Sequence, residues 1–332
     1  MSESTAGPLL EVSDLVVRYP VARGIVAGVA RRPREQVHAV DGVSFAIEAG
    51  EMVALVGESG CGKTTIAQSV IRMVPAVSGS IRFQGREISG LGQRELRPLR
   101  REMQIIYQDP YESLDPRLRV RDAVAEPLEI HRVPASERRG RVVEALTVAG
   151  LTPPELYLDR FPHELSGGQR QRVAIAAGIV LGPKLLVADE PVSMLDVSVR
   201  AGILRLLDDL RRRGLGILMI THDLSTAAHF ADRICVMYLG RIVEQGRARD
   251  VVRNPQHPYT RALISVVPKP DPDDAMAPQI LTGEAPNPIH VPPGCRFNPR
   301  CPVATGACVE TDPALRPAPA AAPGHDAACI LL

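Results

Sequence analysis

The sequence predicts an α/β fold in which helices cover a mainly parallel central sheet. Three observations lead to this prediction: short apolar runs recur along the chain, a glycine-rich loop joins the run at 52–56 to a helical segment, and another helical stretch at 197–213 separates two later apolar runs. Such alternation is typical of parallel sheets, because each helix carries the chain back to the start of the next strand.

The N-terminal part is predicted to consist of strands. Residues 9–19 alternate apolar and polar side chains, and Tyr19-Pro20 ends this strand. Residues 21–38 contain arginine and glycine, so we expect a solvated hairpin loop, with a contact to lipid headgroups as the alternative. A second strand is expected over 40–47, and the run Met52–Val56 is typical of a buried strand.

The rest of the chain divides into a helical part, further strands and a proline-rich end. Residues from about 105 to 178 are expected to be mainly helical, and strands are expected at Leu185–Ala188 and Gly216–Ile220. From about residue 254 proline becomes dense, and four of the six cysteines lie there. We therefore expect a main domain over 1–256 and a small irregular extension over 257–332 that cannot rest on a large core.

The composition excludes some classes of protein. The 332 residues are 45% hydrophobic and 23% charged, as in ordinary globular proteins, and the formal net charge of +1 gives no field that would attract nucleic acid. No apolar run reaches the roughly 18 residues of a membrane-spanning helix. The first residues show no basic segment followed by an apolar one, so the sequence predicts a cytoplasmic protein.

A phosphate-binding loop is predicted between the strand at 52–56 and the next helix. Its residues are Gly57, Glu58, Ser59, Gly60, Cys61, Gly62, Lys63 and Thr64, followed by Thr65. Glycines let backbone N–H groups converge on phosphates, and the positive end of a helix adds to the attraction. Lys63 is expected to contact the β- and γ-phosphates of a nucleoside triphosphate, and the Thr64 hydroxyl to ligate Mg²⁺. The alternative is a glycine-rich turn that arose by chance. Such a turn would not require a strand before it and a helix after it, so the context of this loop disfavours the alternative.

Two adjacent carboxylates, Asp189 and Glu190, end the apolar run at 185–188. At the tip of a strand the first carboxylate is expected to lie near the metal ion. Glu190 would then polarise the attacking water as a general base. Two acids after an apolar run mean little alone, so this prediction depends on the phosphate-binding loop.

The segment Leu165-Ser166-Gly167-Gly168-Gln169-Arg170 resembles the signature motif of the ABC ATPase family. In that family the motif begins a helix and touches the γ-phosphate held by another subunit, through a serine hydroxyl and glycine N–H groups. The same residues also form a Gly-Gly turn that caps a helix, and this interpretation is compatible with the first. The resemblance implies a P-loop NTPase fold of the ABC type with a helical subdomain over about 105–178.

The other family positions follow in order. Gln108 resembles the glutamine that senses the metal ion and the water, and Ser193–Asp196 resembles the D-loop, although Met194 stands where the family more often has alanine. His222 resembles the histidine that reaches the γ-phosphate. Tyr19 resembles the aromatic residue that stacks on adenine, and the alternative is a tyrosine that merely ends a strand.

The resemblance also implies partners. A signature motif that serves another subunit's nucleotide implies a head-to-tail pair with a second ABC ATPase subunit, either a paralogue or a second copy. It further implies two transmembrane permease subunits, an extracytoplasmic substrate-binding protein, a position at the cytoplasmic face of the cell membrane, and no nucleic acid.

The end of the chain resembles one subfamily, the ATPase subunits of oligopeptide and dipeptide importers, with nickel importers as relatives. The resemblance is carried by Asn254–Thr260, Gly294–Pro302 and Cys308. Rival classes remain. A soluble ABC ATPase of DNA repair or translation resembles a tandem or coiled-coil-interrupted arrangement, whereas this chain has one set of motifs, no long heptad segment and no basic stripe. A small-molecule kinase would not need residues 165–169, and an exporter is disfavoured because no membrane-spanning segment is fused.

Four tail cysteines, Cys295, Cys301, Cys308 and Cys329, are candidate metal ligands. A cytoplasmic location argues against structural disulfides. The spacing matches neither a ferredoxin nor a usual zinc site, but four thiolates are enough for a [4Fe-4S] cluster, which some members of the subfamily carry. Zinc and free thiols stay open as alternatives, and Cys61 and Cys235 are expected to be packing residues.

Overall fold

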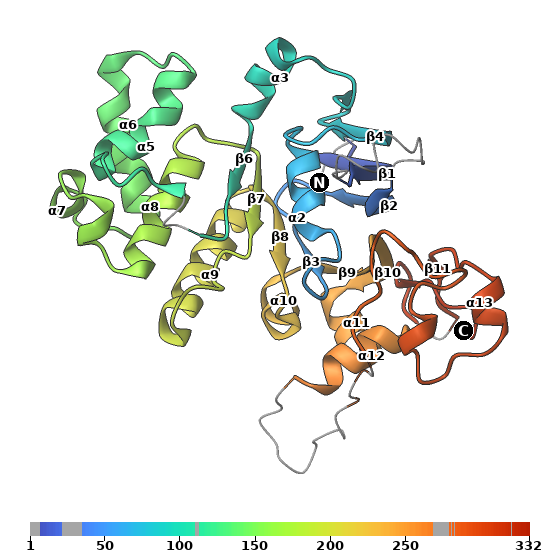
Figure 1. Cartoon of the computed structure of the whole chain (residues 1–332). Coiled ribbons are helices and arrows are strands. Elements are labelled where there is room, and N and C mark those ends of the chain that lie inside the picture. Colours follow the sequence, from blue (N-terminus) through green and yellow to red (C-terminus); the bar gives the residue numbers. More distant parts are fainter. Residues whose placement is uncertain are drawn as a thin grey trace, which may run out of the picture. The chain divides into compact units, whose positions relative to one another are not determined.

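The structure is a computed structural model that describes residues 7–21, 35–109, 113–267, 279, 281, 283–319 and 321–332. Most of the expected loop at 21–38 lies outside these residues. The described chain forms two compact units (Figure 1). The first comprises Phe83–Ile220, Ala46–Met52 and the chain up to Leu10, and the second comprises Glu11–Phe45, Val53–Arg82 and Thr221–Leu332.

The first unit contains three parallel strands, β6 (Met103–Ile106), β7 (Leu185–Asp189) and β8 (Gly216–Thr221). Strand β7 pairs with β6 and with β8, and every residue of β7 and β8 is buried. Burial on both faces explains why these strands are continuous apolar runs. The strands expected at 185–188 and 216–220 are confirmed, whereas the expectation of helix from residue 105 is wrong at its start, because Ile105 and Ile106 complete the pairing of β6 with β7.

Helices follow β6 as expected. They are α5 (Val120–Ile130), α6 (Ala135–Val148), α7 (Glu155–Leu158), the 3-10 helix η1 (Pro162–Glu164) and α8 (Gly167–Ile179). The unit also contains β5 (Arg86–Glu87), α3 (Gln93–Arg100) and α9 (Val197–Arg212). The helical stretch predicted at 197–213 is confirmed within one residue.

The second unit contains parallel strands β3 (Met52–Val56) and β9 (Arg233–Tyr238), with β10 (Arg241–Arg247) antiparallel to β9. In a smaller sheet, β1 (Leu10–Pro20) lies between β2 (Gln36–Ile47) and β4 (Ser78–Phe83). Strand β2 begins at Gln36, four residues earlier than expected. The helices are α2 (Lys63–Val70), α10 (Leu224–Phe230) and α11 (Ala248–Arg253).

The C-terminal extension, residues 257–332, is less irregular than expected. It contains α12 (Pro258–Ser265), η3 (Asn298–Arg300), α13 (Ala307–Glu310), β11 (Arg316–Pro317) and β12 (Asp326–Ala327). Strand β12 continues the sheet by pairing with β10, Glu244 opposite Ala327. The buried rings of Tyr238, Tyr259 and Phe297 pack together, so the extension uses β9 as part of its core.

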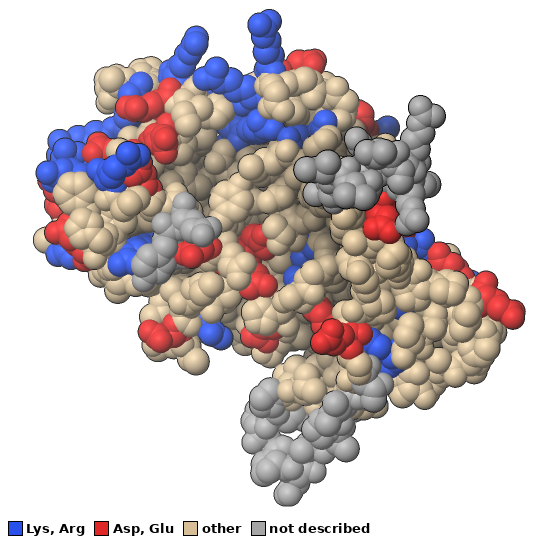
Figure 2. All heavy atoms as spheres, in the orientation of Figure 1, with Lys and Arg blue, Asp and Glu red and all other residues tan. Residues whose placement is uncertain are grey.

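Positive side chains gather locally although the formal net charge is only +1. Figure 2 shows them over the α3 segment, where Arg94, Arg97 and Arg101 are exposed. None of the helices in the described part of the chain has both the length and the apolar character needed to cross a membrane.

Candidate functional site

The glycine-rich loop lies between β3 and α2, as predicted. Lys63 begins α2 and is buried, with 6% of its surface exposed. Its Nζ donates hydrogen bonds to the carbonyl oxygens of Gly57 (2.8 Å) and Glu58 (3.0 Å), so the ammonium group is held inside the loop. The helix has no acidic residue in its first turn, which leaves its N-terminal partial charge available to an anion.

Two glycines are required by the shape of this loop. A Cβ on Gly57 would lie 2.3 Å from the carbonyl oxygen of Met237. Gly62 has φ +106°, and a Cβ there would lie 2.1 Å from the carbonyl oxygen of Ala39. A side chain at either position would displace backbone, so glycine is needed for close packing and, at Gly62, also for the left-handed conformation.

The remaining loop residues differ in exposure. Ser59, Gly60 and Thr64 are exposed, whereas Cys61 is buried and burial raises the pKa of its thiol. The prediction that Cys61 is a packing residue fits this burial. Thr64 therefore presents its hydroxyl at the start of α2, where the sequence predicts a magnesium ligand.

Tyr19 and His222 belong to the same unit as the loop. Tyr19 is half-buried near the end of β1, and His222 is exposed directly after β8. The turn after His222 is held by Asp223, whose carboxylate caps α10 by accepting from the N–H groups of Ser225 (2.9 Å) and Thr226 (3.3 Å). Burial alone would raise the pKa of Asp223, but these hydrogen bonds hold it below the usual value.

The first unit brings together Gln108, Asp189 and Glu190. Asp189 ends β7 and is 4% exposed, and the Gln108 amide Nε2 donates to Glu190 Oε2 over 3.2 Å. Tyr107 is also near, because burial and then the charge of Asp189 raise the pKa of its hydroxyl. Gln108 and Glu190, 82 positions apart, thus meet just after the ends of the paired parallel strands β6 and β7.

Glu190 has an uncommon backbone conformation for a residue with a side chain, with φ +46°. Its N–H donates to the Ile220 carbonyl (2.9 Å), and its own carbonyl accepts from the Ser193 hydroxyl (3.2 Å). A left-handed backbone conformation costs energy for residues other than glycine. It persists where neighbouring groups hold the backbone, as these two hydrogen bonds do at Glu190.

The segment predicted as a signature motif forms the start of α8. Ser166 caps the helix: its Oγ accepts from the Gln169 N–H (3.3 Å), and Gln169 Oε1 accepts from the Ser166 N–H (3.0 Å). A Cβ on Gly168 would lie 2.5 Å from Val199 Cγ1, so the first turn packs closely on α9. No acidic residue lies in this first turn, which keeps it attractive to an anion.

The predicted D-loop lies between β7 and α9, with Asp196 at the N-cap of α9. Met194 and Val197 are exposed by 60% and 80%.

The tail cysteines have free thiols and lie close enough together to affect one another. Burial raises the pKa of Cys295 and of Cys301, and the charges of Cys308 and Cys329 add to both effects. Within the described residues, however, no three His, Cys, Asp or Glu side chains are arranged to hold a metal ion. The donors therefore suit a cluster chemically, but their arrangement is not that of a ready-made site.

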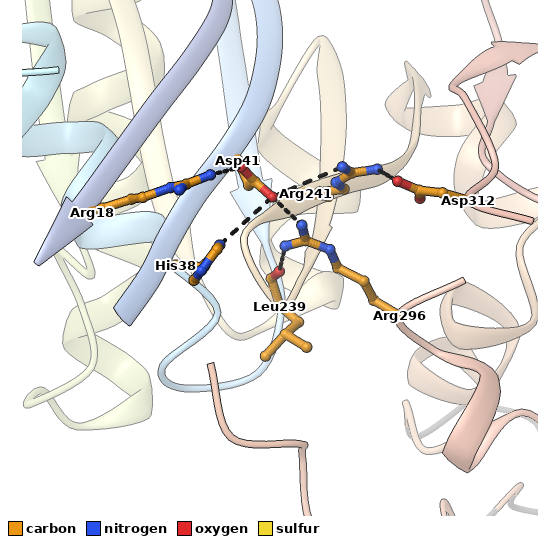
Figure 3. A network of polar contacts seen from close by, with 7 residues as sticks. All are labelled: Arg18, His38, Asp41, Leu239, Arg241, Arg296 and Asp312. Carbon is orange, nitrogen blue, oxygen red and sulfur yellow. Dashed lines mark hydrogen bonds and ion pairs between the residues drawn. The ribbon is translucent and has the colours of Figure 1, made fainter. Parts of the chain in front are cut away.

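A network of charges joins the extension to the smaller sheet (Figure 3). Asp41 of β2 pairs with Arg296, Arg18 (3.4 Å) and Arg241 (3.9 Å). Arg296 also donates to the Leu239 carbonyl (2.6 Å). Burial would raise the pKa of Asp41, but the hydrogen bond and charge of Arg296, with the other arginines, hold it below the usual value.

Sequence reasoning missed one connection to the loop. Arg300 and Tyr259 of the C-terminal extension both contact Glu58. They lie 242 and 201 positions away from it, so no local pattern could have indicated the contact.

The chain is similar to known protein families and to known proteins. Residues 40–193 match the family described as ABC transporter, and residues 243–308 match the family described as Oligopeptide/dipeptide transporter, C-terminal region. The chain is 45% identical over 310 residues to the di/tripeptide transport ATP-binding protein DppF of Pseudomonas aeruginosa, covering 93% of this chain and 94% of that one. It is 44% identical over 312 residues to the oligopeptide transport ATP-binding protein OppF of Escherichia coli, covering 92% of each.

Solved structures confirm the predicted fold class. A post-hydrolysis dimer of the ATP-binding cassette MJ0796 bound to ADP and Pi has a TM-score of 0.63 and 28% identity, covering 72% of this chain and 99% of that chain. The cbiO1 protein of Clostridium perfringens, part of the ABC transporter complex cbiONQ, has a TM-score of 0.64 and 31% identity, covering 74% of this chain and 91% of that one.

Proposed function

The chain belongs to the ABC transporter family of ATP-binding, ATP-hydrolysing proteins, and from this we propose that it is the subunit that energises a multi-subunit importer of peptides. The observation that carries the proposal is the identity of 44–45% with peptide-transport ATP-binding proteins along more than nine tenths of the chain, the oligopeptide-type end included. A soluble ABC ATPase without a transport role would not need that end.

In this proposal the phosphate-binding loop, Tyr19 and His222 hold the nucleotide. The loop Gly57–Thr65 surrounds the phosphates with N–H groups, and Lys63 exchanges its loop carbonyls for the β- and γ-phosphate oxygens. Tyr19 stacks on adenine, and His222 reaches the γ-phosphate. The buried, fully hydrogen-bonded Lys63 supports this role, because its ammonium group is already at the centre of the loop.

Gln108, Asp189 and Glu190 are the proposed groups that act on the γ-phosphate and its metal ion. Glu190 accepts a proton from the attacking water, and the 3.2 Å bond from Gln108 orients the carboxylate. Thr64, Gln108 and Asp189 are the proposed magnesium ligands, a set of oxygen donors that suits this ion. Bound Mg²⁺ would neutralise charge on the phosphates.

In a pair of ATPase subunits, the start of α8 in each subunit would complete the nucleotide site of the other subunit. Ser166, Gly167, Gly168 and Gln169 would bind the γ-phosphate of a second ABC ATPase subunit, and the exposed D-loop with Asp196 would lie in the interface. Closure on ATP and reopening after hydrolysis would then drive two transmembrane permease subunits, to which an extracytoplasmic binding protein delivers the peptide. The subunit would lie at the cytoplasmic face of the membrane.

The division of the chain follows from these roles. Residues 1–256 form the proposed nucleotide-binding domain, and residues 257–332 form the extension with the four cysteines.

We propose that Cys295, Cys301, Cys308 and Cys329 hold an iron–sulfur cluster, with zinc or free thiols as the competing outcomes. The Cys295 N–H donates to the Cys308 carbonyl (2.8 Å), and this proximity of two of the four cysteines supports a common site.

The catalytic proposal is tested by two substitutions with different expected effects. Glu190→Gln keeps the shape of the side chain but removes the base, so ATP should still bind while turnover falls by about 10²–10⁴-fold. Lys63→Ala should instead impair ATP binding. Near-normal turnover by Glu190→Gln, or unchanged affinity and turnover in Lys63→Ala, would contradict these roles.

The metal proposal is tested on protein purified without oxygen. Near-stoichiometric iron and sulfide, lost in Cys301→Ser, would support the cluster. Zinc would make the tail a structural metal site, and absence of metal would leave four thiols without changing the ATPase proposal.

A further inference from the structure

An arginine of the C-terminal extension binds the phosphate-binding loop through both branches of its guanidinium group. Arg300 Nη1 lies 2.8 Å from Glu58 Oε2, and Nη2 lies 3.1 Å from Glu58 Oε1. The Arg300 side chain is 8% exposed and that of Glu58 30% exposed. These parallel bonds, which raise the pKa of Arg300, form the geometry in which an arginine–carboxylate pair is strongest and most directional.

A second group of the extension holds the backbone of the same loop residue. The Glu58 N–H donates to the Tyr259 hydroxyl oxygen over 3.0 Å, and Tyr259 is fully buried. Burial raises the pKa of Tyr259, so its hydroxyl stays neutral. The extension therefore fixes both the side chain and the peptide group of Glu58.

The two contacts come from a rigid part of the extension. Tyr259 packs against Tyr238 and Phe297, with ring centroids 4.7 Å and 5.4 Å away. The Tyr238 hydroxyl accepts a bond from Arg300 Nη1 over 3.4 Å, and the guanidinium lies 5.9 Å from the centre of the Tyr238 ring. This cluster limits how far Arg300 and Tyr259 can move, because close-packed interiors yield little.

Glu58 connects these contacts to the lysine of the loop. Its carbonyl oxygen accepts a bond from Lys63 Nζ (3.0 Å), while its N–H and its carboxylate are bound by the extension. When Lys63 turns to a phosphate, the loop loses this internal bond. The contacts from the extension then remain, together with the bond from the Cys61 N–H to the Glu58 carbonyl (3.3 Å), and hold the first turn of the loop in place.

We propose that Arg300 and Tyr259 are positioning residues for ATP binding, which act by holding Glu58 and thereby the first turn of the phosphate-binding loop. The inference rests on nucleotide binding at this loop. It gives the C-terminal extension a direct part in ATP binding, apart from any metal that its cysteines hold.

The chain offers a matched control for a merely structural role. Arg296 lies four positions before Arg300, its side chain is also 8% exposed, and it also binds a carboxylate, that of Asp41 (Figure 3). Asp41 is in β2 and not in the loop. If Arg300 only anchors the extension, replacement of either arginine should change the affinity for ATP equally.

The experiment measures the dissociation constant for ATP with magnesium, together with unfolding by urea without nucleotide, on the full chain. Arg300→Gln is expected to weaken ATP binding about tenfold, since a charged, paired hydrogen bond is lost. Arg296→Gln should destabilise the fold to a similar degree but change ATP affinity by no more than about twofold. Tyr259→Phe, which removes only the acceptor of the Glu58 N–H, should weaken ATP binding.

A double-mutant cycle identifies the pair that acts. Glu58→Gln with Arg300→Gln should bind ATP no more weakly than either single variant, because each change breaks the same contact. Arg300→Lys keeps the charge without the fork, so its affinity should fall between wild type and Arg300→Gln. Arg300→Lys also provides the test of ATP affinity if Arg300→Gln does not fold.

Two results would overturn the inference. Equal weakening of ATP binding in Arg296→Gln and Arg300→Gln would show general loosening of the extension, and unchanged affinity in both Arg300→Lys and Arg300→Gln would show that the contact has no effect. Failure of the wild-type chain to bind ATP would instead contradict the nucleotide-binding role itself, so the two failures are distinguishable.

Discussion

Replacement of Glu244 by alanine is expected to destabilise the attachment of the C-terminal extension by about 4 kcal/mol. Glu244 lies in β10 and has no exposed surface. Its carboxylate accepts from the N–H groups of Gln256 (2.8 Å) and His257 (2.8 Å), and His325 Nε2 lies 2.6 Å from it. One side chain thus holds the start of the extension and a residue near its end.

The magnitude follows from the groups left behind. Alanine would leave two buried N–H groups and one buried imidazole without an acceptor, and each orphaned group costs roughly 1–3 kcal/mol. Taking the lower half of that range for three groups gives about 4 kcal/mol. Glu244→Gln keeps one carbonyl acceptor, so its loss should be about half as large.

The assay is urea unfolding followed by circular dichroism, combined with hydrogen exchange of the Gln256 and His257 amides. In Glu244→Ala these amides should exchange much faster. Glu310, which is exposed, provides the control, and Glu310→Ala should change the free energy of unfolding by less than about 0.5 kcal/mol. A loss below about 1 kcal/mol in Glu244→Ala, with protected amides, would refute the reasoning.

Three further predictions concern packing and pH. Gly62→Ala should abolish ATP binding, because its Cβ would lie 2.1 Å from the Ala39 carbonyl oxygen; a normal ATP affinity would contradict this. Gly168→Ala should lower ATPase activity through the clash with Val199 Cγ1, and the double variant Gly168→Ala/Val199→Ala should recover part of it if the clash is the cause. Burial lowers the pKa of His257 to about 4, so His257 stays neutral in the fold while the unfolded chain takes up a proton below its ordinary pKa of 6.5. The free energy of unfolding should therefore fall as pH drops from 6.5 towards 4, by about 3 kcal/mol at most. In His257→Asn, which can still cap α12, this fall should be smaller by that amount. Equal pH profiles of the wild type and His257→Asn in urea unfolding would contradict the prediction.

The central strands could be predicted because they are buried on both faces. The runs at 52–56, 185–188 and 216–220 are apolar throughout, and each is observed as a strand. Strand β6 was missed because four residues, Met103–Ile106, carry too little pattern to separate a strand from the start of a helix.

The extension was harder to predict for the same physical reason. Its strands have two residues each, and they form only because β10 offers an edge to pair with. Its core consists of rings that lie on β9, α12 and the loop before η3, so no local pattern predicts it.

In the candidate site, too, the parts encoded by a continuous segment could be predicted and the long-range contacts could not. The loop at 57–64 and the carboxylates Asp189 and Glu190 are continuous in sequence, and a strand precedes each as expected. The contacts of Glu58 with Arg300 and Tyr259 are contacts between distant parts of the chain, which only the fold brings together.

The most direct test of the central claim is uptake of a labelled dipeptide by cells whose own copy of this chain is deleted. The account predicts that the wild-type chain restores uptake and that Glu190→Gln, made at the same level, does not. Uptake that is independent of the chain, or equal restoration by Glu190→Gln, would contradict the claim that ATP hydrolysis by this chain energises peptide import. Restoration of nickel uptake alone would assign the chain to a different importer.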